Sequence, residues 1–108
     1  MSDLQLYKLL AERTARGLPA ALATVIAAHG STPRNAGAKM IIFPDASTKG
    51  TIGGGCGEGQ VIRAALEAML GSGLPRVVTV DLTDEMGTRE TDVCGGKMAV
   101  FVEPFGMR

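Results

Sequence analysis

The sequence predicts a single compact α+β domain, or a three-layer α/β domain, with a mostly β sheet flanked by two helices. Two stretches carry apolar residues at helical spacing, and short runs rich in β-branched residues, typical of strands, lie between and after them. The 108 residues are 45% hydrophobic, which is enough for one core but not for two domains. The expected element order is α-β-β-β-α-β-β, which is not a regular βαβ alternation, so a Rossmann fold is not expected.

The first half of the chain is predicted to form one helix and three strands. Ser2 or Asp3 can cap the helix, and Gly17 ends it. The strands are indicated by β-branched and small apolar residues between turn-forming segments. The expected elements are a helix over 2–17, strands over 20–28 and 39–43, and, after a turn at 44–47, a short strand near Thr51 and Ile52.

The second half is predicted to form one helix and two strands. The helix has the widest apolar face in the chain, and Gly71 and Gly73 end it. Pro75 then opens a strand, and an acidic loop separates that strand from the last one. The expected elements are a helix over 60–70 and strands over 76–82 and 97–103, with the acidic loop at 83–93.

Glycine is concentrated in two segments that also contain both cysteines. Six of the 15 glycines lie between Gly50 and Gly59, and two more follow Cys94. A glycine-rich loop between a strand and a helix points backbone N–H groups at one place, which suits phosphate or another anion. The P-loop pattern is absent, and Glu58 stands where G-x-G-x-x-G requires glycine. The loop therefore predicts contact with an anion or cofactor without identifying it.

Each cysteine admits two interpretations. Cys56 is expected in the first turn of the second helix, where the helix dipole favours a reactive thiolate, while Glu58 either counters this or caps free amides. Cys94, before Gly95 and Gly96, has a similar setting. The alternative is a tight turn with two unrelated buried cysteines. Two cysteines cannot make a four-cysteine zinc site, and no metal site is predicted.

Three further features are weaker candidates. Arg34, in a loop with Ser31, could bind phosphate in bidentate fashion, or it is an ordinary surface arginine. His29, which is the only histidine, could pair with a cysteine, although a turn residue is the simpler interpretation. The acidic residues at 81–92 do not follow the EF-hand spacing and indicate a solvated loop.

Charge and hydropathy exclude other classes of protein. Eleven basic and 11 acidic residues balance, which argues against binding nucleic acid or a membrane surface through bulk charge. No apolar run approaches the ~20 residues of a spanning helix. The N-terminus lacks the features of a signal peptide. A cytoplasmic location is expected.

Five motifs in order resemble the N-terminal domain of the XdhC/CoxI family, the accessory proteins of xanthine dehydrogenase and related molybdenum hydroxylases. The resemblance runs from about Leu4 to Pro104, and the ordered set is more specific than any single motif. It implies that residues 1–108 form one such domain, without the Rossmann-like C-terminal domain that family members usually carry. The motifs are Ala21-Leu22-Ala23-Thr24-Val25, Gly30-Ser31-Thr32-Pro33-Arg34, Gly37-Ala38-Lys39-Met40, the segment from Gly50 to Glu58, and Val93-Cys94-Gly95-Gly96.

The resemblance implies a maturation factor that binds the molybdenum cofactor, molybdopterin, and supports its sulfuration or its insertion into an apo-hydroxylase. It implies an accessory protein rather than a turnover enzyme. The expected partners are the apo-hydroxylase, a cysteine desulfurase and a separate Rossmann-domain protein, and the small core makes a homodimer plausible. The implied cofactor-binding residues are Ser31, Arg34, Gly53, Gly54, Gly55, Cys56, Glu58, Cys94, Gly95 and Gly96, of which Cys56 and Cys94 would act chemically.

Two other functions stay open. One is a thiol-based sulfurtransferase that uses Cys56, and the other is a non-catalytic module that docks a partner subunit. The sequence departs from the family at Gly57, where a larger apolar residue is usual. This glycine makes the loop more flexible and weakens the start of the helix by up to ~1 kcal/mol relative to alanine.

Overall fold

The computed structural model describes residues 1–30, 35–53, 57–81 and 96–106. Within these ranges the element order is the predicted one, with two helices and five strands. The fold is not Rossmann-like, because every pair of neighbouring strands is antiparallel. The elements are α1 (Asp3–Ala15), β1 (Ala20–His29), β2 (Lys39–Ile42), β3 (Thr48–Gly50), α2 (Glu58–Leu70), β4 (Arg76–Asp81) and β5 (Lys97–Phe105).

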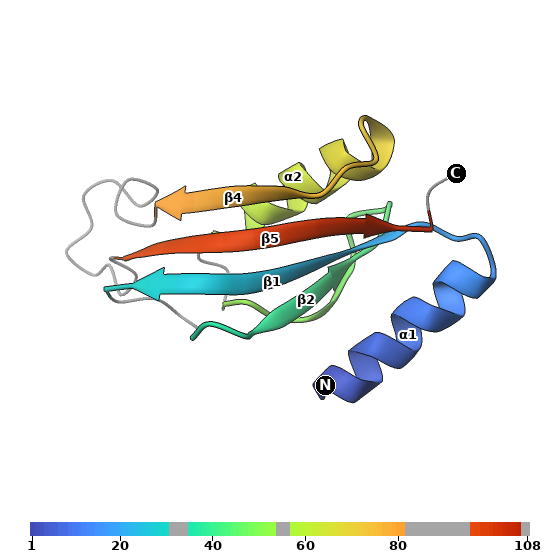
Figure 1. The fold of residues 1–108 in the computed structure, drawn as a ribbon, viewed down its shortest axis with the longest axis horizontal. Coiled ribbons are helices and arrows are strands. Elements are labelled where there is room, and N and C mark those ends of the chain that lie inside the picture. Colours follow the sequence, from blue (N-terminus) through green and yellow to red (C-terminus); the bar gives the residue numbers. More distant parts are fainter. Residues whose placement is uncertain (31–34, 54–56, 82–95, 107–108) are drawn as a thin grey trace.

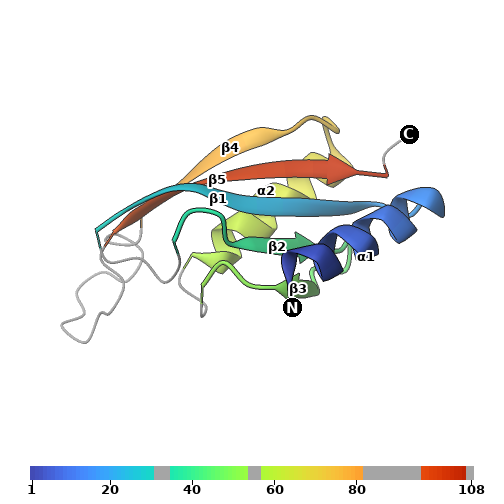
Figure 2. The same cartoon turned by 60° about the horizontal axis from the view of Figure 1, so that its bottom comes forward.

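The strands form one sheet in the order β3-β2-β1-β5-β4 (Figure 1). The longest strand, β1, lies in the middle and pairs with β2 on one side and β5 on the other. The two helices lie on opposite faces of this sheet (Figure 2). α2 packs against β5, β1, β4 and β2, whereas α1 packs chiefly against β2 and β1. α2 therefore packs across four of the five strands of the described sheet, whereas α1 covers chiefly two.

The alternation of side chains along the strands separates two cores. In β1, Ala21 and Ala23 face α2, whereas Leu22 faces α1. In β2 the same alternation places Met40 and Ile42 on the α2 face and Ile41 on the α1 face. Successive side chains of a strand point to opposite faces, so both faces of these two strands must be apolar. This explains why the strand sequences are continuously hydrophobic.

β1 contains a bulge at Ile26. Val25 pairs with Val100 and Ala27 pairs with Ala99, so two residues of β1 stand opposite one residue of β5. The side chain of Ile26 is 50% exposed. Such an extra residue bends the strand locally and leaves itself unpaired.

Local sequence signals explain where the first helix and the first hairpin begin. Ser2 caps α1 in a capping box, because its hydroxyl accepts from the Gln5 N–H and the Gln5 side chain accepts from the Ser2 N–H. The predicted turn at 44–47 is present, and the Asp45 carboxylate accepts from both the N–H and the hydroxyl of Ser47. These hydrogen bonds hold the pKa of Asp45 below its usual value.

One element was predicted in the wrong place. The short strand expected near Thr51 and Ile52 is β3, Thr48–Gly50. The turn closes directly, with the Phe43 N–H bonded to the Ser47 carbonyl at 2.9 Å, so pairing starts at once with Thr48 opposite Ile42. The other predicted boundaries differ from the observed ones by up to two residues, and helix and strand ends commonly shift by this much.

Gly50 ends β3 in a conformation and a space that exclude a side chain. Its φ is +79°, and a Cβ added there would lie 2.8 Å from the Lys39 carbonyl oxygen and 3.3 Å from Leu6 Cδ1. The close approach joins the end of β3 to β2 and to α1. It also sets the direction in which the chain enters the glycine-rich segment.

We therefore expect Gly50→Ala to lower the free energy of unfolding by about 2–4 kcal/mol, which combines left-handed strain with a steric clash. The matched control is Gly73→Ala, where φ is +72° but no atom lies within 4 Å of the added Cβ. The control should cost only about 1–2 kcal/mol of strain. Urea denaturation of both variants measures the difference, and equal losses would contradict the steric argument.

Candidate functional site

Thr51 links the two ends of the glycine-rich segment. Its hydroxyl oxygen lies 2.6 Å from Glu58 Oε2, 2.6 Å from the Gly53 carbonyl oxygen and 3.0 Å from the Gly53 nitrogen. Gly53 precedes residues 54–56, which lie outside the described part of the chain, and Glu58 is the first residue of α2. One hydroxyl thus closes the base of the segment that contains the triple glycine and Cys56.

The proton count of the Thr51 hydroxyl limits how these contacts form. The hydroxyl accepts from the Gly53 N–H, and it has a single proton to donate. Its two acceptors, Glu58 Oε2 and the Gly53 carbonyl, are at the same distance. A carboxylate is the stronger acceptor, so the bond to Glu58 is favoured while that carboxyl is ionised. The carboxylate is thereby held beside the end of β3, and α2 has no side-chain cap.

The backbone at the N-terminus of α2 has the chemistry to bind an anion. Its N-cap is Gly57, which has a φ of +81° and no side chain to satisfy the first amides. The first amides of a helix attract anions through their N–H groups and the helix dipole. The helix begins at Glu58, and Cys56, which was predicted to lie in its first turn, lies outside the described residues. The positive φ of Gly57 lies outside the helical region and places this residue before the helix.

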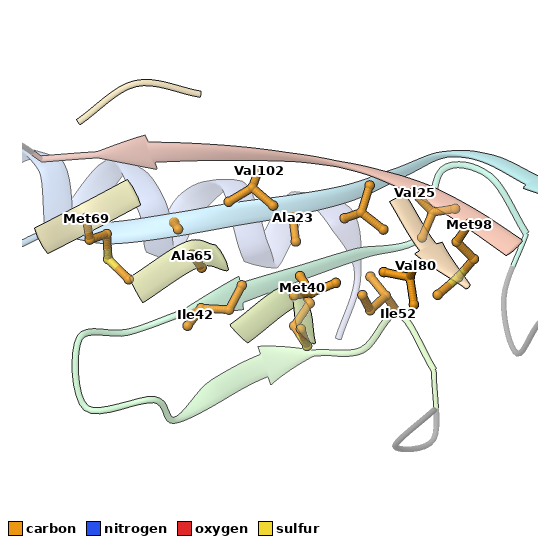
Figure 3. Packing of buried hydrophobic residues seen from close by; sticks show 13 residues of the cluster. Ala23, Val25, Met40, Ile42, Ile52, Ala65, Met69, Val80, Met98 and Val102 are labelled. Carbon is orange, nitrogen blue, oxygen red and sulfur yellow. The ribbon is translucent and has the colours of Figure 1, made fainter. Parts of the chain in front are cut away.

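The described residues that flank the candidate loops meet at one end of the sheet. Ile52, Val80 and Met98 belong to one buried cluster together with Val25 (Figure 3). Ile52 directly precedes the glycine-rich segment, Val80 lies near the end of β4, and Met98 is the second residue of β5. A shared hydrophobic core therefore fixes the points from which the two cysteine-containing segments start.

Strand pairing brings His29, which precedes the third candidate loop in the sequence, to the same end of the sheet. His29, the last residue of β1, stands opposite Lys97, the first residue of β5. Lys97 also stands opposite Asp81, with 4.0 Å between its Nζ and Asp81 Oδ2. In the sequence, residues 31–34 follow shortly after the end of β1. β1, which precedes this loop, therefore ends beside the start of β5, and the start of β5 lies beside the end of β4. β4 and β5 flank the second cysteine-containing segment.

Of the predicted site residues, the structure describes Gly53, Glu58 and Gly96. It brings Gly53 and Glu58 together through Thr51, and Gly96 is buried immediately before β5. His29 is exposed at the end of β1. Within the described ranges no three His, Cys, Asp or Glu side chains are grouped as a metal site would need. Ser31, Arg34, Gly54, Gly55, Cys56, Cys94 and Gly95 lie outside the described residues.

Thr51 is the residue that the sequence analysis missed. A threonine at the end of a strand indicates only β propensity. The useful signal was its position just before the glycine run, together with an acidic residue at the start of the following helix. Hydroxyl side chains in such places bond to nearby backbone N–H groups.

Thr51, Gly53 and Glu58 belong to one of the motifs that resemble the XdhC/CoxI family. Comparison with known proteins tests this resemblance. The model of the XdhC and CoxI family matches residues 14–81. The chain belongs to the XdhC/CoxI family. The match includes both Thr51 and Glu58, and it is consistent with the N-terminal domain of a member.

The chain is also similar to two further proteins. The uncharacterized protein YqeB of Escherichia coli strain K12 is 39% identical over 90 residues, which are 83% of this chain and 16% of that protein. A crystal structure described as a xanthine dehydrogenase from Bacillus halodurans has a TM-score of 0.79 and 33% identity, and it covers 96% of this chain and 30% of the solved one. The chain thus spans less than a third of either relative. In the part of the XdhC/CoxI domain that the structure describes, neither helix is long and apolar enough to cross a membrane.

We expect Thr51→Val to lower the free energy of unfolding by about 1.5–3 kcal/mol, because it removes a hydrogen bond to a charged group. Thr51→Ser, which keeps the hydroxyl, should retain most of the stability. The matched control is Thr79→Val at an exposed position of β4, which should change stability by less than about 0.5 kcal/mol.

A double-mutant cycle isolates the contact between the two side chains. If the Thr51 hydroxyl binds the Glu58 carboxylate, Thr51→Val and Glu58→Ala together should cost less than the sum of the single losses by at least about 0.5 kcal/mol. Strict additivity in chemical denaturation would show that the two side chains do not interact in solution.

Proposed function

We propose that this chain is a maturation factor for a molybdenum hydroxylase of the xanthine dehydrogenase type. It binds the molybdenum cofactor and supports sulfuration or insertion of that cofactor, in the cytoplasm. Membership of the XdhC/CoxI family carries this proposal. The relative described as a xanthine dehydrogenase supports the same class of partner.

The described residues fit one part of such a cofactor. Molybdopterin carries a terminal phosphate, and phosphate binds well at helix N-termini that offer free N–H groups. The N-cap of α2 is Gly57, which has no side chain and makes no side-chain cap hydrogen bond. Gly53 and Gly57 have no side chains, so backbone atoms would make the contacts at this end of the helix.

Glu58 would oppose an anion at this place unless its charge were directed away. The Thr51 hydroxyl, 2.6 Å from Glu58 Oε2, holds the carboxylate toward the end of β3. That hydrogen bond also spreads part of the negative charge onto Thr51 and, through it, onto the Gly53 N–H. In the proposed function, Thr51 and Glu58 shape the base of the loop, and the backbone amides bind the phosphate.

The proposed roles of the two cysteines are taken from the family motifs. Cys56 follows the triple glycine and precedes the open helix end, and Cys94 precedes Gly95 and Gly96. The cofactor would supply a dithiolene-bound molybdenum, for which a thiolate is a suitable ligand or sulfur donor. In the proposal, Ser31 and Arg34 add hydrogen-bond donors for the phosphate. A separate Rossmann-domain protein and a cysteine desulfurase are the further partners proposed.

The decisive experiment is titration of the purified 108-residue chain with isolated molybdopterin, followed by pterin fluorescence. We expect saturable binding, and we expect Cys56→Ser to weaken it by at least about tenfold, equivalent to ~1.4 kcal/mol. Inorganic phosphate should compete, because the helix end binds the phosphate group. The control variant is Ser72→Ala, a substitution in the turn after α2 and far along the helix from the site.

Two results would contradict the proposal. Absence of molybdopterin binding by a folded chain would exclude cofactor binding by this domain. Unchanged affinity and unchanged hydroxylase activation in Cys56→Ser would remove Cys56 from the site. A persulfide on Cys56 after incubation with a cysteine desulfurase, without molybdopterin binding, would instead identify a sulfurtransferase.

A further inference from the structure

A groove separates α1 from the partly covered face of the sheet. Its volume is about 810 Å³, and α1, β1 and β5 supply most of its lining. Figure 1 shows α1 on the β2 side of the sheet, away from β4, and α1 packs chiefly against β2 and β1. The lining is mainly apolar and includes Tyr7, Leu10, Leu22, Ile26, Phe101 and Phe105.

The same side of α1 carries an exposed apolar stripe that continues from the groove. Leu4 is 68% exposed and Tyr7 is 46% exposed. Ala11 and Ala15 are also exposed and follow at helical spacing. Small residues at two of the four positions let another surface approach the helix closely. The stripe therefore has the shape and polarity of a helix face that packs against an apolar groove.

One charge in the groove has no partner. Glu103 lies on the groove floor in β5 and is partly buried, and within the described residues its carboxylate makes no ion pair or hydrogen bond. The lysine that lines the groove, Lys39, is already paired with Asp3 at 3.2 Å. A partly buried carboxylate gains most from a cation supplied by whatever covers it. The groove thus selects an apolar segment that carries a basic residue.

This chain itself contains such a segment. Lys8 is exposed on α1 one turn after Leu4, at the edge of the stripe, and it makes no ion pair among the described residues. Groove and stripe therefore complement each other in polarity and in charge. Because both belong to one surface, a two-fold axis can satisfy both at once, with each contact made twice.

We propose that this surface joins two copies of the chain in a homodimer. α1 of each subunit lies in the groove of the other, and Lys8 pairs with the partner subunit's Glu103 on both sides of the axis. The interface buries the stripe from Leu4 to Ala15 and the groove residues Ile26 and Phe101. It lies on the sheet face opposite to α2, so it is separate from the helix N-terminus that the proposed cofactor binding uses.

The test is sedimentation equilibrium of the full 108-residue chain over a wide concentration range. We expect a monomer–dimer equilibrium. Lys8→Glu and Glu103→Lys should each weaken dimerisation at least about tenfold, since each places like charges in contact. The double variant reverses the pair and should restore the dissociation constant to within about threefold of the original.

Matched helix-surface variants separate this surface from others. Ala11→Glu places a charge in the stripe at an exposed helix position and should weaken the dimer at least about tenfold. Leu70→Glu makes the same kind of change on α2, where Leu70 is 79% exposed, and should leave the dimer unchanged. Circular dichroism spectra of all variants should remain those of the folded chain.

Three outcomes would overturn the proposal. One is a chain that stays monomeric up to about 1 mM, a concentration at which even a weak specific dimer would form. The second is a double charge reversal that fails to restore the dimer. The third is a loss in Leu70→Glu as large as that in Ala11→Glu. In the first case the groove would bind a different protein.

Discussion

The whole structure depends on the double pairing of β1. This strand pairs with β2 on one side and with β5 on the other, and its two faces enter separate cores. Its buried residues on the α2 face, and Ala20 and Leu22 on the α1 face, are therefore held by cross-strand neighbours and by a helix at once. The α2 face is built from the small residues Ala21 and Ala23, which lets α2 come close to the sheet. A slip of one residue would exchange the two cores, so the register is strongly specified.

The candidate site depends on this arrangement for its position rather than for its chemistry. Ile52, Val80 and Met98 are buried side by side, and each lies within a few residues of a segment that carries a candidate site residue. The core thus brings together the starting points of segments that are far apart in the sequence. The Thr51 hydroxyl then adds a polar link at the edge of this core, where the chain passes from β3 to α2.

The element order could be predicted from the sequence because each element carries its own signal. Ser2 and Gln5 mark the start of α1, and Pro44 to Ser47 mark the hairpin. Sheet order could not be predicted, because β5 inserts between β1 and β4 through contacts distant in sequence. The glycine-rich segment was recognised by composition, whereas the Thr51–Glu58 contact was missed because it depends on where the turn places two side chains seven residues apart.

The bulge at Ile26 makes β1 one residue longer than its partner requires. Val25 and Ala28 face the same core on either side of it, opposite Val100 and Met98. Loss of Ile26 would leave Ala27 opposite Ala99 in a regular ladder. The side chains on both sides of the deletion would therefore keep facing the same cores. Most deletions within a two-sided central strand would exchange its faces. At this one position the domain can therefore change length in evolution, and with it the apolar surface it shows to solvent, without altering its register.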